Sequence, residues 1–82
     1  MGFEELRLVR KAVGMRATER AIQRGEAKKV YLAMDVDRKI REKIETLAKE
    51  KGIEIEWVFS AKELGRACGI EVASSCVAVL DS

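Results

Sequence analysis

The first quarter of the chain carries apolar residues at the spacing of a helix. They recur every three or four positions, at Phe3, Leu6, Val9 and Val13. This spacing predicts an amphipathic helix from about residue 3 to residue 13. A second helix is predicted from about Arg16 to Arg24, because Gly14 offers a break before it and Gly25 occupies the usual position just past a helix end.

The middle of the chain changes to a strand-like pattern and back again. Residues 30–34 are a continuous apolar run, which predicts a buried strand. The following segment carries an apolar stripe at Ile40, Ile44, Leu47 and Ala48, which predicts a helix. Asp35 or Asp37 would cap the start of this helix, and Gly52 would end it.

The last third contains two more strand patterns around a short helix. Residues 53–59 alternate between apolar and mainly acidic side chains, which is the period of a strand. Ser60 and Glu63 match a capping box, and this predicts a short helix that stops at Gly69. Residues 76–80 are continuously apolar, as expected for a central strand.

The predicted order of elements is therefore α-α-β-α-β-α-β. Strands that alternate with helices predict an α/β fold, here a three-layer α/β/α sandwich around a small, mostly parallel sheet. At 82 residues the chain has room for one core, so residues 1–82 are expected to form a single domain.

The charge distribution is uneven, although the formal net charge is only +2. Residues 1–41 carry a net charge of +5 and residues 42–82 a net charge of −3. Such asymmetry between the two halves of a chain points to an anionic partner. No apolar run reaches the roughly 18–20 residues that cross a membrane, so a cytoplasmic protein without a membrane segment is expected.

The composition argues against an enzyme. The chain has no histidine, so a Cys–His pair and a Ser–His triad lack essential parts, and a zinc site is badly short of ligands. Cys68 and Cys76 lie among small and apolar residues, and we expect two buried free thiols. No cofactor, metal or catalytic residue is predicted.

The start of the second predicted helix is the first candidate site. A helix N-terminus presents unpaired amides and the positive end of the helix dipole, which suit a phosphate or a guanine edge. Arg16, Arg20 and Arg24 are four residues apart and would form one row, while Lys11 adds to the positive charge nearby. The alternative interpretation is a solvated basic helix face.

Residues 64–75 are the second candidate site. Gly65 and Gly69 would permit a close backbone approach, and Ile70 and Val72 would be apolar residues on a loop. A nucleotide-binding loop is one interpretation, but the segment matches neither the P-loop pattern nor GxGxxG. From these residues alone, tight packing of a helix on a strand is the simpler explanation.

Together the two segments resemble the kink-turn RNA-binding family. This family includes archaeal and eukaryotic large-subunit ribosomal proteins, a spliceosomal and box C/D core protein, and small bacterial YbxF-like proteins. The resemblance runs from about Leu6 to Leu80 and is sharpest over residues 62–73, which read KELGRACGIEVA. The short chain is most similar to the YbxF-like branch. The resemblance implies the same α/β/α sandwich.

The resemblance also implies roles for residues in both segments. Members of the family grip a sharply bent RNA beside tandem sheared G·A pairs. The resemblance implies contacts by Gly14, Arg16, Ala17 and Arg20 in the first segment and by Ile70, Glu71 and Val72 in the second. Lys11, Met15 and Arg24 are predicted to join them from their charge and their place around the helix start. Arg16 and Ala17 stand where the best-known members carry Asn and Glu. Alanine accepts no hydrogen bond from guanine, whereas Arg16 can donate one or two.

We therefore expect a monomeric protein that binds structured RNA with a kink-turn, either on the ribosome or in another RNA such as a riboswitch. The alternative is a protein-interaction module, since the same fold also serves signalling proteins that do not bind RNA. Dense positive charge at the second helix favours RNA, whereas the missing Asn–Glu pair leaves room for the alternative.

Overall fold

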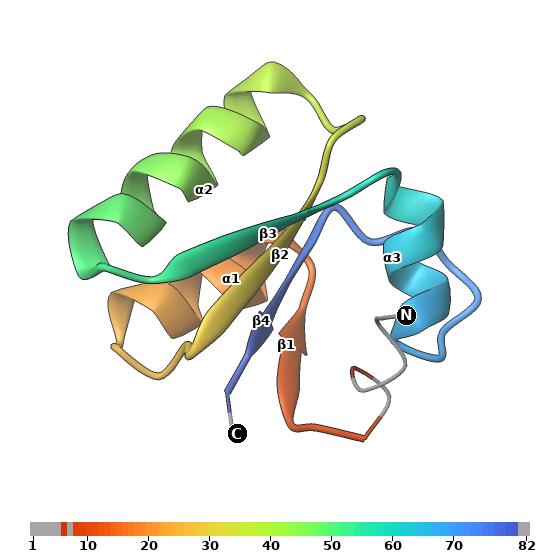
Figure 1. The fold of residues 1–82 in the computed structure, drawn as a ribbon, viewed down its shortest axis with the longest axis horizontal. Helices are drawn as coiled ribbons and strands as arrows, with labels where there is room; N and C mark the ends of the chain where they lie inside the picture. The colour runs from red at the N-terminus through yellow and green to blue at the C-terminus, as the bar shows by residue number, and fades with distance from the viewer. Residues whose placement is uncertain (1–5, 7, 81–82) are drawn as a thin grey trace.

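The computed structural model describes Leu6 and residues 8–80 of the chain. Their helices and strands are shown in Figure 1. In chain order they are β1 (Lys11–Val13), α1 (Met15–Gln23), β2 (Lys29–Ala33), α2 (Arg38–Lys51), β3 (Glu54–Val58), α3 (Ala61–Ala67) and β4 (Cys76–Val79). None of the helices in these residues is long and apolar enough to cross a membrane.

The four strands form one mixed sheet in the order β1-β4-β2-β3. β2 and β3 are parallel, with Leu32 beside Trp57. β4 is antiparallel to both of its neighbours, with Val77 beside Val13 of β1 and beside Tyr31 of β2. β4 is thus an inner strand, as its continuous apolar sequence predicts.

Helices cover both faces of the sheet, so the sandwich has the three layers that were predicted (Figure 1). On one face, Ile22 of α1 and Ile44 of α2 pack against Val30 and Leu32 of β2. On the other face, Leu64 and Cys68 at α3 pack with Leu6 against Tyr31, Val58 and Val77. Each strand side chain falls on one face or the other because successive side chains alternate.

The prediction of a helix over residues 3–13 is wrong where the structure describes them. Lys11–Val13 form β1, at the edge of the sheet, and Leu8–Arg10 lie in a turn. Residues 1–5 and 7 lie outside the described part. Leu6 is buried, whereas Val13, which belongs to the same predicted stripe, is 37% exposed. A spacing of three or four positions does not distinguish a helix from a turn followed by three strand residues, and pairing with β4 decides in favour of the strand.

The expected order of elements and the mostly parallel sheet therefore need correction. The described chain begins with a strand, and two of the three strand pairings are antiparallel. The direction of β4 follows from residues 70–75, which carry the chain back to the end of the sheet where β3 stops. The amide of Ala33, at the end of β2, donates a hydrogen bond of 3.0 Å to Ser75 O just before β4 begins.

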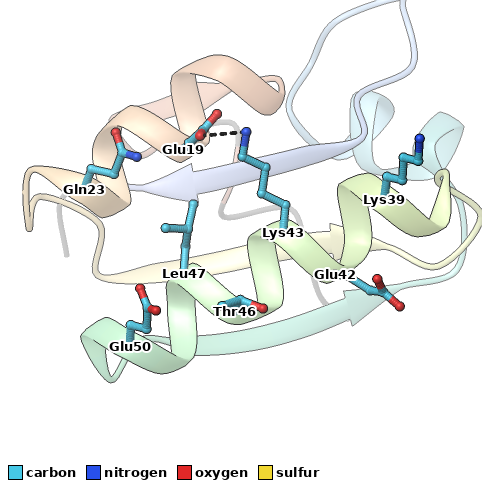
Figure 2. A pocket seen from close by; sticks show the side chains of 8 residues that line it. All are labelled: Glu19, Gln23, Lys39, Glu42, Lys43, Thr46, Leu47 and Glu50. Carbon is cyan, nitrogen blue, oxygen red and sulfur yellow. Dashed lines mark ion pairs between the residues drawn. The ribbon is translucent and has the colours of Figure 1, made fainter.

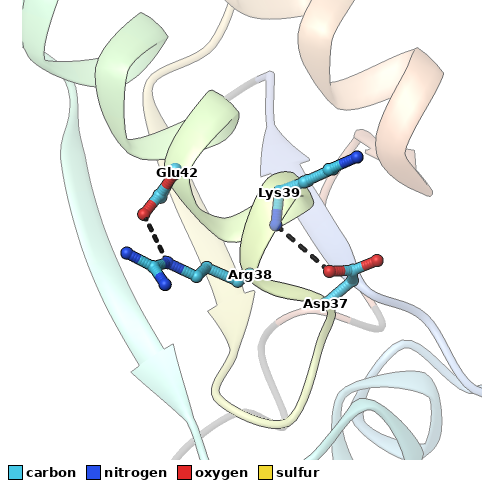
Figure 3. A network of polar contacts seen from close by, with 4 residues as sticks. All are labelled: Asp37, Arg38, Lys39 and Glu42. Carbon is cyan, nitrogen blue, oxygen red and sulfur yellow. Dashed lines mark hydrogen bonds and ion pairs between the residues drawn. The ribbon is translucent and has the colours of Figure 1, made fainter.

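The predicted helix starts and stops are largely confirmed. The side chain of Asp37 accepts a hydrogen bond of 3.2 Å from the amide of Lys39 and caps α2, beside an ion pair of 2.9 Å between Arg38 and Glu42 (Figure 3). Gly52 ends α2 in the left-handed conformation, at φ +68°. Ser60 caps α3 by accepting a hydrogen bond from the amide of Glu63.

Candidate functional site

The start of α1 is open to solvent and carries no acidic residue. Gly14 precedes the helix at φ +99°, a conformation that favours glycine, and no side chain caps the helix. The first amides of a helix have no partners inside the helix. The dipole adds partial positive charge at this end. The first turn of α1 is therefore suited to an anion or to the carbonyl edge of a base.

The predicted arginine row is present and exposed. Arg16, Arg20 and Arg24 are exposed, whereas Thr18, Ala21 and Ile22 on the opposite side are buried. None of the three arginines forms an ion pair with a described residue. Their guanidinium groups are therefore available to an external anion or to a guanine edge.

Glu19, the acidic residue next to this row, is neutralised by a lysine of the neighbouring helix. Glu19 accepts an ion pair of 3.0 Å from Lys43 of α2 at the top of a shallow depression of about 470 Å³ between α1 and α2 (Figure 2). This depression carries both signs of charge. Pairing with Lys43 directs the Glu19 carboxylate toward α2, so the exposed row keeps its positive potential.

The loop after α3 is held at several points by hydrogen bonds. The amide of Ile70 donates to Gly65 O (3.1 Å), and the amide of Ser74 donates to Ala61 O (3.0 Å). Ser74 is buried, and its hydroxyl donates to Cys76 O at 3.0 Å. The loop is thus ordered before any ligand arrives, which lowers the entropic cost of binding.

Gly65 lets this loop lie directly against α3. A Cβ atom built on Gly65 would lie 2.0 Å from Val72 O and 3.1 Å from the carbonyl carbon of Val72. Only glycine fits this contact, as the pair of glycines in the sequence suggests. The contact turns the side chain of Val72 outward, where it is 67% exposed.

One carbonyl joins the loop to the start of α1. Cys76 O accepts a hydrogen bond of 2.9 Å from the amide of Gly14 as well as the bond from the hydroxyl of Ser74. A further bond, of 2.9 Å from the amide of Ala61 to the side chain of Asp35, fixes the start of α3 to the turn after β2. The start of α1 and the end of the loop are therefore joined through one buried carbonyl group.

The remaining predicted site residues differ in where they lie. Ala17 is half-buried in the first turn of α1, and Glu71 is exposed on the loop. Met15 packs against the core beneath α1, and Ile70 packs against the core beneath α3, so it is less exposed than expected. Lys11 lies on the α3 face, close enough to affect the Cys68 thiol, and is thereby separated from the arginine row.

Two residues that position the site are not evident from the sequence pattern. Ser74 is a buried polar residue in a loop, and its neighbour Ser75 is also serine, so nothing marks which of them is buried. The sequence predicts Asp35 as a candidate cap for α2, whereas its side chain accepts a hydrogen bond from the amide of Ala61 in α3, 26 residues away. In the sequence, the small residues around Ser74 indicate close packing, but they do not identify the buried serine.

The two cysteines are free and buried, as predicted. Burial raises the pKa of the Cys76 thiol and of the Cys68 thiol, so both favour the neutral form. In the described residues, no cluster of three or more Cys, Asp and Glu side chains could hold a metal ion.

The sequence of this chain matches a known family model and several known proteins. The model of the "Ribosomal protein L7Ae/L30e/S12e/Gadd45 family" matches residues 6–82. The "RNA-binding protein YbxF" of Geobacillus stearothermophilus is 40% identical over 81 residues, which cover 98% of this chain and 99% of that protein. An "RNA-binding protein" of Bacillus pumilus is 40% identical over 68 residues, 83% of each chain.

A solved structure of similar fold supports the architecture. A protein described as being of unknown function from Bacillus halodurans C superposes with a TM-score of 0.89 at 23% sequence identity. The match covers 98% of this chain and 84% of that chain. At this level of identity the likeness concerns the fold alone.

Proposed function

This chain belongs to the ribosomal protein L7Ae/L30e/S12e/Gadd45 family, and from that premise we propose that it binds structured RNA at a kink-turn. Relatives that match nearly the whole chain are named RNA-binding proteins. RNA is also the partner favoured by the arginine row, which has no ion pair with the described residues, and by the net charge of +5 on residues 1–41.

The observation that carries the proposal is the shared carbonyl of Cys76. Its bonds to Gly14 and Ser74 join a helix start, whose arginines form no ion pair with a described residue, to a loop with an exposed Val72 side chain, which supports a single binding surface. A sharply bent RNA offers both kinds of target, since it presents guanine edges and phosphates to the helix and unstacked bases to the apolar loop.

The proposed contacts divide by chemistry. In the proposal, the amides around Gly14 and the guanidinium groups of Arg16 and Arg20 meet the guanine edges of the sheared pairs, while Arg24 meets a phosphate. Val72 packs on an extruded base, with Glu71 and the half-buried Ile70 beside it. Met15 and Ala17 support the first turn, and Lys11 supplies a phosphate contact from the α3 face.

We extend the proposal to the setting of the protein. It acts in the cytoplasm as a monomer of one domain, without catalysis and without a cofactor, on ribosomal RNA or on another folded RNA such as a riboswitch. The alternative function, a protein-interaction module that does not bind RNA, predicts no affinity for any such RNA.

A gel-shift comparison of two RNAs tests the proposal. The first RNA contains a kink-turn, and in the second the sheared G·A pairs are replaced by Watson–Crick pairs. Binding to the second RNA should be at least about tenfold weaker, since each good bidentate contact to a base is worth roughly 1–3 kcal/mol. Equal affinity for both RNAs would exclude kink-turn recognition, and no binding to either would favour the alternative.

The salt dependence tests the electrostatic part separately. With about three to five phosphate contacts, log K should fall against log[salt] with a slope of roughly −2 to −4.5. The measurement is a series of titrations with the kink-turn RNA between low and moderate salt. A slope near zero would contradict the role given to the basic half of the chain.

A further inference from the structure

The outer edge of β3 is a surface that the proposed RNA site does not use. β3 is the last strand of the sheet and, among the residues that the structure describes, pairs with β2 alone. Its second edge therefore presents backbone N–H and C=O groups to solvent, and such an edge is a template for another strand. The side chains along β3 determine which kind of strand this edge can bind.

Large apolar side chains are exposed at the C-terminal ends of β2 and β3, next to this edge. Trp57 is 39% exposed, Phe59 is 78% exposed just after the strand, and Met34 is 55% exposed where β2 ends. They are three of the six exposed large apolar residues in the described part of the chain. Trp57 lies beside Leu32, and the amide of Met34 donates to Val58 O at 2.8 Å, so the three residues are on neighbouring strand ends. Clustered exposure of this kind marks an interaction site.

The opposite face of the same strand is acidic. Glu56 forms an ion pair with Lys29, and the hydrogen bond to Glu56 is the main reason that the pKa of Lys29 is raised. Glu54 has no ion-pair partner among the described residues, although its charge also acts on Lys29. Two carboxylates thus act on one ammonium group, and one of them, Glu54, keeps its charge without an ion pair among the described residues.

The negative charge of these glutamates determines which kind of partner the edge of β3 can bind. Residues 54–63 hold three glutamates and one lysine, which disfavours the phosphates of RNA. A second copy of the chain is also disfavoured, because the antiparallel register that aligns two β3 strands fully sets Glu56 against Glu56. Like charges directly opposite one another destabilise a strand pair.

We propose that the outer edge of β3 binds an extended segment of a partner protein that carries lysine or arginine on one face and apolar side chains on the other. The segment adds a fifth strand to the sheet, and main-chain hydrogen bonds to the edge give the affinity. Its basic residues lie beside Glu54 and Glu56, and its apolar residues lie beside Trp57 and Phe59. This inference does not depend on the proposed RNA function.

The test uses a seven-residue peptide of alternating lysine and valine, acetylated and amidated at its ends. Trp57 is the only tryptophan of the chain, so its fluorescence reports on the edge directly, and amide chemical shifts locate the contact. We expect shifts confined to residues 53–59 and a change in tryptophan emission. A peptide with glutamate in place of lysine should bind weakly or not at all.

Reversing one charge sharpens the test. Glu54→Lys should weaken binding of the lysine peptide about fivefold, because a favourable cross-strand pair becomes a like-charge pair. The same variant should gain binding of the glutamate peptide, and Glu54→Gln should fall between. Glu50→Lys, at another exposed glutamate, on α2, should leave both affinities unchanged. Kink-turn RNA affinity should stay the same in all three variants.

Four outcomes would overturn the proposal. These are equal binding of the two peptides, shifts outside residues 53–59, a change of Trp57 emission on addition of RNA, and concentration-dependent shifts of residues 53–59 without peptide. The third would assign the edge to RNA, and the fourth would assign it to self-association. Failure of the peptide test with intact RNA binding would leave the proposed function untouched.

Discussion

The amide of Gly14 donates a hydrogen bond of 2.9 Å to the carbonyl oxygen of Cys76, so that the start of α1 is fixed to the start of β4. The hydroxyl of Ser74 donates to the same oxygen. Because both lone pairs of one carbonyl are used, the loop before Cys76 cannot shift without disturbing the helix start. The two parts of the proposed interface are about sixty residues apart in the chain, and this carbonyl holds the loop end in place relative to the helix start.

Removing the buried hydroxyl should weaken this junction. Ser74→Ala deletes one hydrogen bond to Cys76 O and should lower the free energy of unfolding by about 1 kcal/mol, the usual net value of such a bond. Urea denaturation followed by circular dichroism measures this change. Ser75→Ala is the matched control, since the Ser75 hydroxyl makes only a 3.8 Å contact to the Cys76 sulfur. Equal losses in the two variants would contradict the role assigned to Ser74.

A methyl group at Gly65 should displace the loop from α3. Gly65→Ala places a Cβ atom 2.0 Å from Val72 O, and such overpacking costs about 1–3 kcal/mol of stability. It should also reduce affinity for kink-turn RNA, because Val72 moves. The measurements are urea denaturation and RNA titration of the folded variant.

Gly52→Ala separates the two effects of the Gly65 substitution. Gly52 ends α2 at φ +68° with open space around it. Its replacement should cost about 1–2 kcal/mol through backbone strain alone. RNA affinity of the folded protein should then be unchanged. Normal RNA binding by Gly65→Ala would show that the loop adapts and that RNA binding does not require glycine at this position.

Much of the fold was predictable because its strongest signals are local. The stripe at Ile40, Ile44 and Ala48 and the caps at Asp37 and Ser60 act within a few residues of where they are read. The inner position of β4 follows from its continuous apolar sequence. In the site, the exposed arginine row and the exposed Val72 follow from the same local patterns.

What the sequence did not predict depends on contacts between distant segments. β1 is three residues long, too short for a period to be recognised, and it exists because Ala12 pairs with Ala78. The antiparallel direction of β4 depends on how residues 70–75 return along the protein, which no pattern within them specifies. Likewise Asp35 finds its partner at Ala61, across a separation that no local rule spans.

Val72 and Ile70 should separate binding from stability. Val72 is 67% exposed, so Val72→Ala should change the free energy of unfolding by less than about 0.5 kcal/mol. It should weaken RNA binding by about 1 kcal/mol if the side chain is buried against a base. Ile70 packs partly against the core, so Ile70→Ala should instead cost about 1–2 kcal/mol of stability. If melting instead shows a loss of stability for Val72→Ala, and titration a loss of RNA affinity for Ile70→Ala, the roles of the two residues are exchanged.

Arg20 is the residue to which we assign specificity. It lies in the exposed row one turn into α1 and has no ion-pair partner among the described residues, so its guanidinium can donate two parallel hydrogen bonds to a guanine edge. Arg20→Ala should weaken binding to kink-turn RNA by about 1–3 kcal/mol. Arg24→Ala, one turn further along, should cost less at high salt, since a phosphate contact is screened.

An RNA in which Watson–Crick pairs replace the sheared G·A pairs distinguishes recognition of bases from attraction to phosphate. On this RNA the guanine edges are no longer presented in the same way, so wild-type protein and Arg20→Ala should bind equally weakly. Arg16 provides an internal comparison: if it substitutes for the asparagine of better-known relatives, Arg16→Ala should lose about as much on the kink-turn RNA as Arg20→Ala. A loss by Arg20→Ala that is the same on both RNAs would mean that Arg20 is a phosphate contact, and specificity would then have to reside in Arg16 and the amides beside Gly14.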